Sequence, residues 1–169
     1  MDKKKNQALL IKSFYNTFSK DKDIKLWIVG DGPEYSNLKK LIEELKLSDQ
    51  VTLIGRVSRD KVKVLLSKSN AFVLSSQVET FGVVIIEALA MGLPVIATKC
   101  GGPESIITNK NLGLLVENDD EEAMYRALKQ IFVNYKDFDR NFLIEYVKSN
   151  FSEQTIVLKL ISIYSGILD

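Results

Sequence analysis

Residues 74–104 read LSSQVETFGVVIIEALAMGLPVIATKCGGPE. The stretch predicts a helix from Val83 to Met91 between two buried apolar strands, at 71–74 and 94–98. Gly92 and Pro94 end that helix in a common way. The loop before the helix contains Gly82. A strand, a glycine-containing loop and a helix N-terminus in this order are typical of an anion-binding site.

The predicted helix VVIIEALAM is apolar on every side except at Glu87. Such a helix is expected to be buried, and a carboxylate inside it is costly unless it is paired or hydrogen-bonded. Two interpretations of Glu87 follow. It meets a basic side chain or backbone donors from a neighbouring loop, or it binds the hydroxyls of a ligand at the open end of the helix.

A second carboxylate, Glu79, lies just before the helix, with seven residues between it and Glu87. The first N–H groups of a helix have no internal partners and favour negative charge. They suit a phosphate, whereas the carboxylates suit the hydroxyls of a sugar. The segment therefore predicts a nucleotide-sugar ligand.

The remaining sequence alternates strands and helices along one domain, residues 1–169. Strands are expected at 24–29, 51–54, 71–74, 94–98 and 112–116. Helix-length spacing between them predicts a parallel sheet with helices on both faces. Glycines follow the first four of these strands, at the edge where such sheets bind ligands. Ser58, Asp31, and Asn118 or Asp119 are predicted helix caps.

Composition limits the function further. The chain has 23 Lys and Arg against 22 Asp and Glu, which gives no support to nucleic-acid binding. There is no apolar run of membrane-spanning length and no signal peptide. The single cysteine, Cys100, suits a reducing compartment and predicts a cytoplasmic protein. The absence of histidine and of clustered carboxylates predicts no metal site.

Four motifs together resemble the family 4 retaining glycosyltransferases. They are the two glutamates within ETFGVVIIEALAMGLPVIA, the run Gly30-Asp31-Gly32-Pro33, the run Gly55-Arg56-Val57, and the run Gly101-Gly102-Pro103-Glu104. The resemblance covers residues 5–164. It implies a Rossmann-like fold, the C-terminal donor-binding half of the two-domain GT-B architecture.

The resemblance also implies roles for the central segment. Glu79 would bind hydroxyls of the donor sugar, and Glu87 would bind the ribose hydroxyls of the nucleotide. Backbone N–H groups around Phe81, Gly82 and Val83 would bind the distal phosphate.

Roles for two other loops follow from the same resemblance. Arg56 and Val57 would border the nucleobase, and the alternative for Arg56 is a solvated loop residue. Gly30 and Gly32 resemble the family's loop between strand and helix, with turn geometry and capping by Asp31 as the simpler explanation.

The family binds the diphosphate with an arginine and a lysine, and Lys5 resembles that lysine. The strand and the Gly-Arg before it, and the N-terminal acceptor domain, are not in this sequence. We therefore expect a donor domain that is inactive alone, with Lys5 disordered in a frayed terminus. Residues 152–168 resemble the helix that packs toward the missing half.

The implied reaction is metal-independent transfer of a sugar from a nucleotide-sugar to an acceptor hydroxyl, with no cofactor, in polysaccharide or glycolipid synthesis. The acceptor sugar or glycolipid would bind through the N-terminal domain, and the full-length enzyme would associate peripherally with a membrane. The alternatives are a non-enzymatic nucleotide-binding regulatory domain, a dinucleotide-dependent oxidoreductase, and half of a GT-B-type sugar-nucleotide epimerase. The sequence predicts neither the sugar nor the base.

Overall fold

The computed structural model describes residues 1–168. The strands in this range are β1 (Leu26–Val29), β2 (Val51–Gly55), β3 (Phe72–Leu74), β4 (Val95–Thr98) and β5 (Gly113–Val116). The α-helices are α1 (Gln7–Phe18), α2 (Tyr35–Glu44), α3 (Arg59–Ser67), α4 (Val83–Ala90), α5 (Gly102–Ile106), α6 (Glu121–Asn134), α7 (Arg140–Phe151) and α8 (Glu153–Leu168). Two short 3-10 helices are η1 (Lys3–Lys5) and η2 (Tyr135–Asp137). The predicted alternation of strands and helices is confirmed.

All strand pairings among the described residues are parallel, as predicted. The pairings form two sheets: β1 pairs with β2, and β4 lies between β3 and β5. Along β1, Ile28 is buried, whereas Trp27 and Val29 are 38% and 39% exposed. Within residues 1–168, one face of β1 is therefore incompletely covered, and β1, β2, β3 and β5 each keep one edge without a partner strand.

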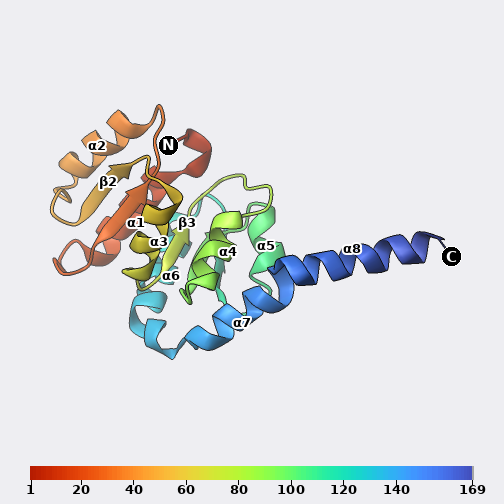
Figure 1. Ribbon diagram of the computed structural model, residues 1–169. Helices are drawn as coiled ribbons and strands as arrows, with labels where there is room; N and C mark the ends of the chain where they lie inside the picture. Colours follow the sequence, from red (N-terminus) through yellow and green to blue (C-terminus); the bar gives the residue numbers. More distant parts are fainter. Residues whose placement is uncertain (169) are drawn as a thin grey trace.

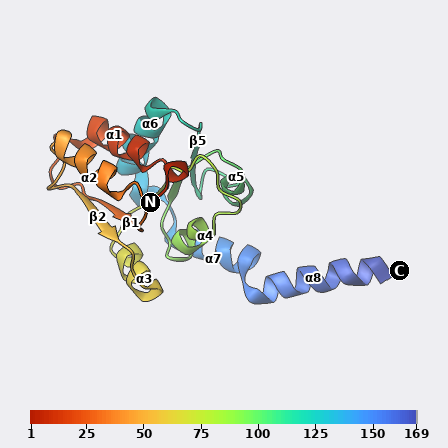
Figure 2. The same cartoon turned by 90° about the horizontal axis from the view of Figure 1, so that it is seen from above.

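Helices cover the sheets from two sides (Figures 1 and 2). Neighbouring residues of β4 point into two different cores, because side chains alternate across a strand. Ile96 packs in a core built mainly from α1, α6 and the β1–β2 sheet. Val95 and Ala97 pack in a second core, built mainly from α4, α5 and α7. The apolar run of β4 is thus explained by burial on both faces.

The helix caps agree with the sequence in one case and differ in two. Ser58 caps α3 by accepting a hydrogen bond from the Lys61 N–H, as predicted. The cap of α6 is Asp120, which accepts from the Ala123 N–H, so the prediction of Asn118 or Asp119 was wrong. Both of those side chains bind other loops instead.

The prediction that Asp31 caps a helix was also wrong. The Asp31 carboxylate accepts a hydrogen bond from the adjacent Gly32 N–H. Helix α2 begins only at Tyr35, and no side chain caps it. Asp31 therefore shapes the turn after β1. Turn geometry was the second part of the explanation predicted for this loop, beside capping.

Helix α8 leaves the body of the molecule after α7 and extends away from it in both views (Figures 1 and 2). Its exposed apolar side chains are Ile156, Val157, Leu158, Leu160, Ile161, Ile163 and Tyr164. No helix within residues 1–168 combines the length and apolar character needed to cross a bilayer. An apolar helix surface of this kind is typical of an interaction site.

Candidate functional site

Two loops at the carboxyl ends of β3 and β4 are joined through their backbones. The Glu79 N–H donates to the Cys100 carbonyl at 3.2 Å, and the Gly102 N–H donates to the Glu79 carbonyl at 2.7 Å. The backbone of Gly102 also packs on Phe81, so closely that a Cβ at Gly102 would lie 2.4 Å from the Phe81 carbonyl carbon. This close packing fixes the course of the loop that leads into α4.

Replacement of Gly102 by alanine tests this close approach. We expect Gly102→Ala to lower the free energy of unfolding by about 1–3 kcal/mol, because the new methyl group meets rigid backbone. Thermal and urea unfolding measure the change. Gly166→Ala is the matched control, since its Cβ would have no neighbour within 4 Å and alanine favours the helix. Equal stability of Gly102→Ala and the native chain would contradict the prediction.

The side chain of Glu79 forms an ion pair with Lys5. The distance from Lys5 Nζ to Glu79 Oε2 is 2.8 Å, and the two side chains are 45% and 19% exposed. The hydrogen bond from Lys5 is the largest effect on Glu79 and lowers its pKa, and the Lys5 charge and the Phe81 and Thr80 N–H groups act in the same direction against the effect of burial. Glu79 is therefore ionised at neutral pH.

The structure corrects the expectation that Lys5 is disordered. Lys5 ends η1, whose cap Asp2 accepts a hydrogen bond from the Lys4 N–H. The carbonyl of Lys4 accepts from the Gln77 N–H at 2.7 Å. The carbonyl of Lys5 accepts from Ser75 Oγ at 2.9 Å. The terminus is thus fastened to the loop that carries Glu79.

Helix α4 begins at that loop without a side-chain cap. Gly82 is the N-cap residue, at φ 97°, and has no side chain to satisfy the first N–H groups of the helix. This left-handed conformation favours glycine. Phe81 and Val83, on either side of Gly82, are both exposed. The helix N-terminus therefore has no side-chain cap, and its use as an anion site stays a prediction.

Glu87 departs from prediction in its surroundings. It is exposed and has no ion pair or side-chain hydrogen bond among residues 1–168. Helix α4 buries only the face of Ile85, Ala88 and Leu89, whereas Val83 on the opposite face is 57% exposed. The prediction of a helix buried all round was wrong, because only one side of α4 packs on the cores. Glu87 lies one turn into the helix on its open side.

The predicted residues of the first two strands lie at the expected edge but apart from this ion pair. The Gly30 N–H donates to the Gly55 carbonyl at 2.8 Å and joins the ends of β1 and β2. Gly32 lies against Met1, whose carbonyl accepts from the Glu34 N–H.

Arg56 follows β2 and is exposed, and Val57 is half-buried. Within the described residues, no hydrogen bond or ion pair links either of them to Glu79 or α4. The structure therefore brings Lys5, Glu79, Phe81 and the start of α4 together, and it leaves Arg56 and Val57 at the neighbouring sheet.

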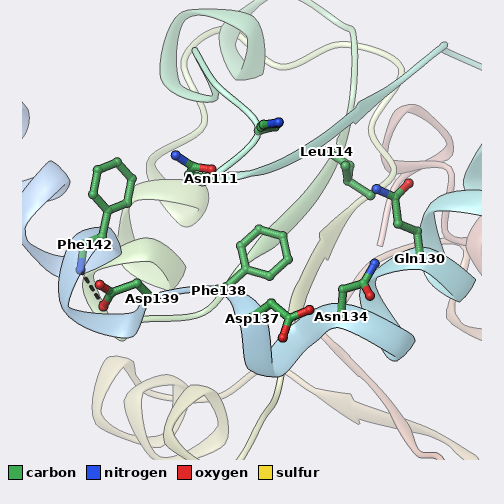
Figure 3. Close-up of a pocket in the computed structure, with 9 residues that line it drawn as sticks. Asn111, Leu114, Gln130, Asn134, Asp137, Phe138, Asp139 and Phe142 are labelled. Atoms are coloured by element: carbon green, nitrogen blue, oxygen red, sulfur yellow. Dashed lines mark hydrogen bonds between the residues drawn. The ribbon is translucent and has the colours of Figure 1, made fainter.

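Within the described residues, one cavity lies away from this site and another borders its terminal segment. A cavity of about 440 Å³ lies between α6, η2, α7 and the segment before β5, and it is lined by Asn111, Gln130, Asn134, Phe138 and others (Figure 3). In it the Asp139 carboxylate caps α7 by accepting from the Phe142 N–H. This cavity is at the amino end of β5, the edge opposite to Glu79. A cavity of about 300 Å³ borders η1 and Gln77.

Sequence reasoning missed the residues that hold the site together. Phe151, the last residue of α7, packs edge-on against Phe81, with ring centroids 6.3 Å apart. Gln77 and Asp119 are joined by hydrogen bonds between loops. Polar residues directly after β3 and β5 were the available signal for this second pair. No group of His, Cys, Asp or Glu in the described chain is arranged to hold a metal ion.

The fold places the protein in the class of parallel α/β domains. The carboxyl ends of its strands carry a cation, carboxylates and a helix N-terminus without a side-chain cap. A family model described as "Glycosyl transferases group 1" matches residues 1–149. The chain belongs to this glycosyl transferase family. Its fold is that of the C-terminal half of GT-B glycosyltransferases, as predicted.

Several relatives are similar over most of the chain. N-acetyl-alpha-D-glucosaminyl L-malate synthase from Bacillus anthracis is 34% identical over 149 residues, 86% of this chain and 38% of that protein. A glycosyltransferase structure from Rickettsia africae is 28% identical at a TM-score of 0.86, covering 100% of this chain and 46% of that one.

A TarM mutant structure from S. aureus, in complex with fondaparinux, alpha-GlcNAc-glycerol and UDP, is 26% identical at a TM-score of 0.86. It covers 97% of this chain and 34% of that one. The chain thus spans less than half the length of each of these three relatives.

Proposed function

We propose that this chain binds the nucleotide-sugar donor of a retaining glycosyltransferase, which transfers the sugar to an acceptor hydroxyl. The observation that carries the proposal is the Lys5–Glu79 ion pair in front of the uncapped N-terminus of α4. A cation, a carboxylate and free N–H groups are the partners that a diphosphate linked to a sugar requires. Membership of the glycosyl transferase family supports the reaction class.

The chemical task is to stabilise the leaving diphosphate while the bond between sugar C1 and its phosphate oxygen breaks. Lys5 and the N–H groups around Phe81, Gly82 and Val83 do this electrostatically, because they are fixed before the negative charge develops. Glu79 accepts hydrogen bonds from hydroxyls of the donor sugar. Because Lys5 and Glu79 are paired with each other, donor binding exchanges part of this pair for contacts to phosphate and sugar.

The nucleoside lies along the open side of α4. Glu87 accepts hydrogen bonds from the ribose hydroxyls, and its exposure leaves the carboxylate free to do so. Arg56 and Val57 border the base, and the loop with Gly30 and Gly32 completes that side. UDP is the nucleotide to test first, because the related S. aureus structure contains UDP.

The acceptor binds to a second, N-terminal domain of the full-length enzyme. Relatives more than twice as long as this chain support a second domain. The apolar surface of α8 supports contacts between the two halves. The acceptor is a growing polysaccharide or a glycolipid. The full-length enzyme is cytoplasmic and associates peripherally with a membrane.

Calorimetric titration of the chain with UDP, GDP and ADP tests the donor site. We expect one diphosphate to bind, and Glu87→Gln to weaken that binding by about tenfold. The melting temperature should not change, because Glu87 is exposed and makes no side-chain contact of its own among the described residues. Glu43→Gln, at another exposed helical glutamate, is the matched control.

Two results would count against this proposal. Native-like affinity of a folded Glu87→Gln variant would remove the ribose role. Failure of all three diphosphates to bind the native chain would contradict the donor site itself.

A further inference from the structure

Two residues beside the ion pair hold a disfavoured backbone conformation and contact each other. Asn6 and Asp119 have φ of 48° and 57°, in the left-handed region. Residues other than glycine rarely adopt this region, and such outliers concentrate at functional sites. The Asn6 side-chain amide donates to Asp119 Oδ1 at 2.7 Å. Two left-handed positions far apart in the sequence therefore meet directly after Lys5.

The loop that carries Glu79 joins the same carboxylate. The Gln77 side-chain amide donates to both oxygens of Asp119, at 2.8 and 3.1 Å. The neighbouring Asn118 amide donates to the Gln77 carbonyl at 2.8 Å. The loop between β5 and α6 thus binds both the side chain and the backbone carbonyl of Gln77.

Asp119 therefore links the two segments whose side chains form the ion pair. Asn6 follows Lys5 directly, and Gln77 precedes Glu79 by two residues. Two further hydrogen bonds join the segments, from Gln77 to Lys4 and from Ser75 to Lys5. In both, the acceptor is a backbone carbonyl of the N-terminal segment. Among the hydrogen bonds of residues 1–168, Asp119 is the only side chain that accepts from both segments at once.

We infer that Asp119 is a positioning residue, which holds Lys5 against Glu79 and so arranges the diphosphate site. It touches neither the ion pair nor, on this inference, the ligand. The expected effect of Asp119 on nucleotide binding rests on the proposed function. Its effect on the geometry of the ion pair does not. The carboxylate is exposed, so the effect comes from three convergent hydrogen bonds and not from burial.

The test compares Asp119→Asn with the native 169-residue chain. Asparagine tolerates the left-handed backbone but loses the charge and one acceptor oxygen. We expect the NMR titration midpoint of the Glu79 carboxyl to move up toward its ordinary value of 4.5, because Lys5 is less well placed. We expect UDP affinity to fall by about fivefold. In a Lys5→Met background, Asp119→Asn should change neither quantity further, since both act through one contact.

Two further variants separate positioning from general stability. Asp119→Gly also suits the left-handed backbone but removes all three hydrogen bonds to the carboxylate, so it should raise the Glu79 midpoint and weaken UDP binding at least as much as Asp119→Asn while the chain stays folded. Asp120→Asn removes the neighbouring charge but keeps a good cap for α6, so it should leave the Glu79 midpoint unchanged.

An unchanged Glu79 midpoint in folded Asp119→Asn and Asp119→Gly would overturn the inference, and so would an undiminished effect in the Lys5→Met background. If the native chain bound none of UDP, GDP and ADP, the proposed function would fail, and the ligand-free titration would still decide the role of Asp119.

Discussion

Replacing Lys5 by methionine should lower the affinity of the chain for UDP by about a hundredfold. Methionine keeps much of the length of the side chain but removes the charge that pairs with Glu79 at 2.8 Å. On the proposed function, the same charge neutralises the diphosphate. The fold should persist, because the hydrogen bonds that fasten this segment to Ser75 and Gln77 use backbone carbonyls.

Calorimetry and two matched variants check this result. Lys4→Met removes the same charge one residue earlier, where the side chain has no ion pair or hydrogen bond within the described chain, so its affinity should stay near the native value. Lys5→Arg should restore part of the loss, because arginine also binds phosphate. Equal losses of UDP affinity in Lys4→Met and Lys5→Met would mean that only the net charge affects binding. Lys5 would then have no specific role.

The same variant has a second readout in the pH dependence of stability. The hydrogen bond from Lys5 lowers the pKa of Glu79 below its ordinary value of 4.5. Glu79 therefore contributes stability above its unfolded pKa, and this contribution is lost as the pH falls through the folded pKa. The native chain should melt above Lys5→Met at neutral pH. The difference should shrink in acid, and a constant difference at all pH values would contradict the ion pair as its cause.

The fold could be predicted because its signals are local. The run from Val95 to Ala97 is apolar without alternation, as expected of a strand buried on both faces, and the glycines after the strands mark the ends of elements. Both features depend on a few neighbouring residues. The same reasoning failed at Glu87, because apolar side chains on every side of a helix do not reveal how many sides are packed. Val83 and Val84 are apolar and exposed.

The contacts that assemble the site could not be predicted, because they join distant segments. Lys5 and Glu79 are 74 residues apart, and Asn6 and Asp119 are 113 residues apart. No local pattern in the sequence indicates that η1 folds back onto the loop after β3. The resemblance named Lys5 and Glu79 separately, but their direct pairing without a ligand was not expected. Asp119 was interpreted as a cap because aspartate before a helix is usually one.

Sugar transfer should require a second domain, so we expect no turnover by this chain alone. The groups proposed here bind the donor, and the proposal assigns the acceptor to the second domain. Release of UDP from nucleotide-sugars, measured with and without simple sugar acceptors, should stay at the background rate while UDP still binds. Steady transfer catalysed by the 169-residue chain would contradict this prediction. It would also contradict the assignment of donor and acceptor to separate domains.

A chimera extends the test to the proposed second domain. The matched region of the Bacillus anthracis synthase covers 38% of that protein, so this chain can replace it and leave the rest intact. If both halves of a GT-B enzyme are then present, transfer should appear and should be lost again in Lys5→Met. In the chimera, α8 should also become protected from hydrogen exchange, because its apolar side chains, exposed here, would be covered by the added domain. Transfer without protection of α8 would place the domain contact elsewhere on the chain.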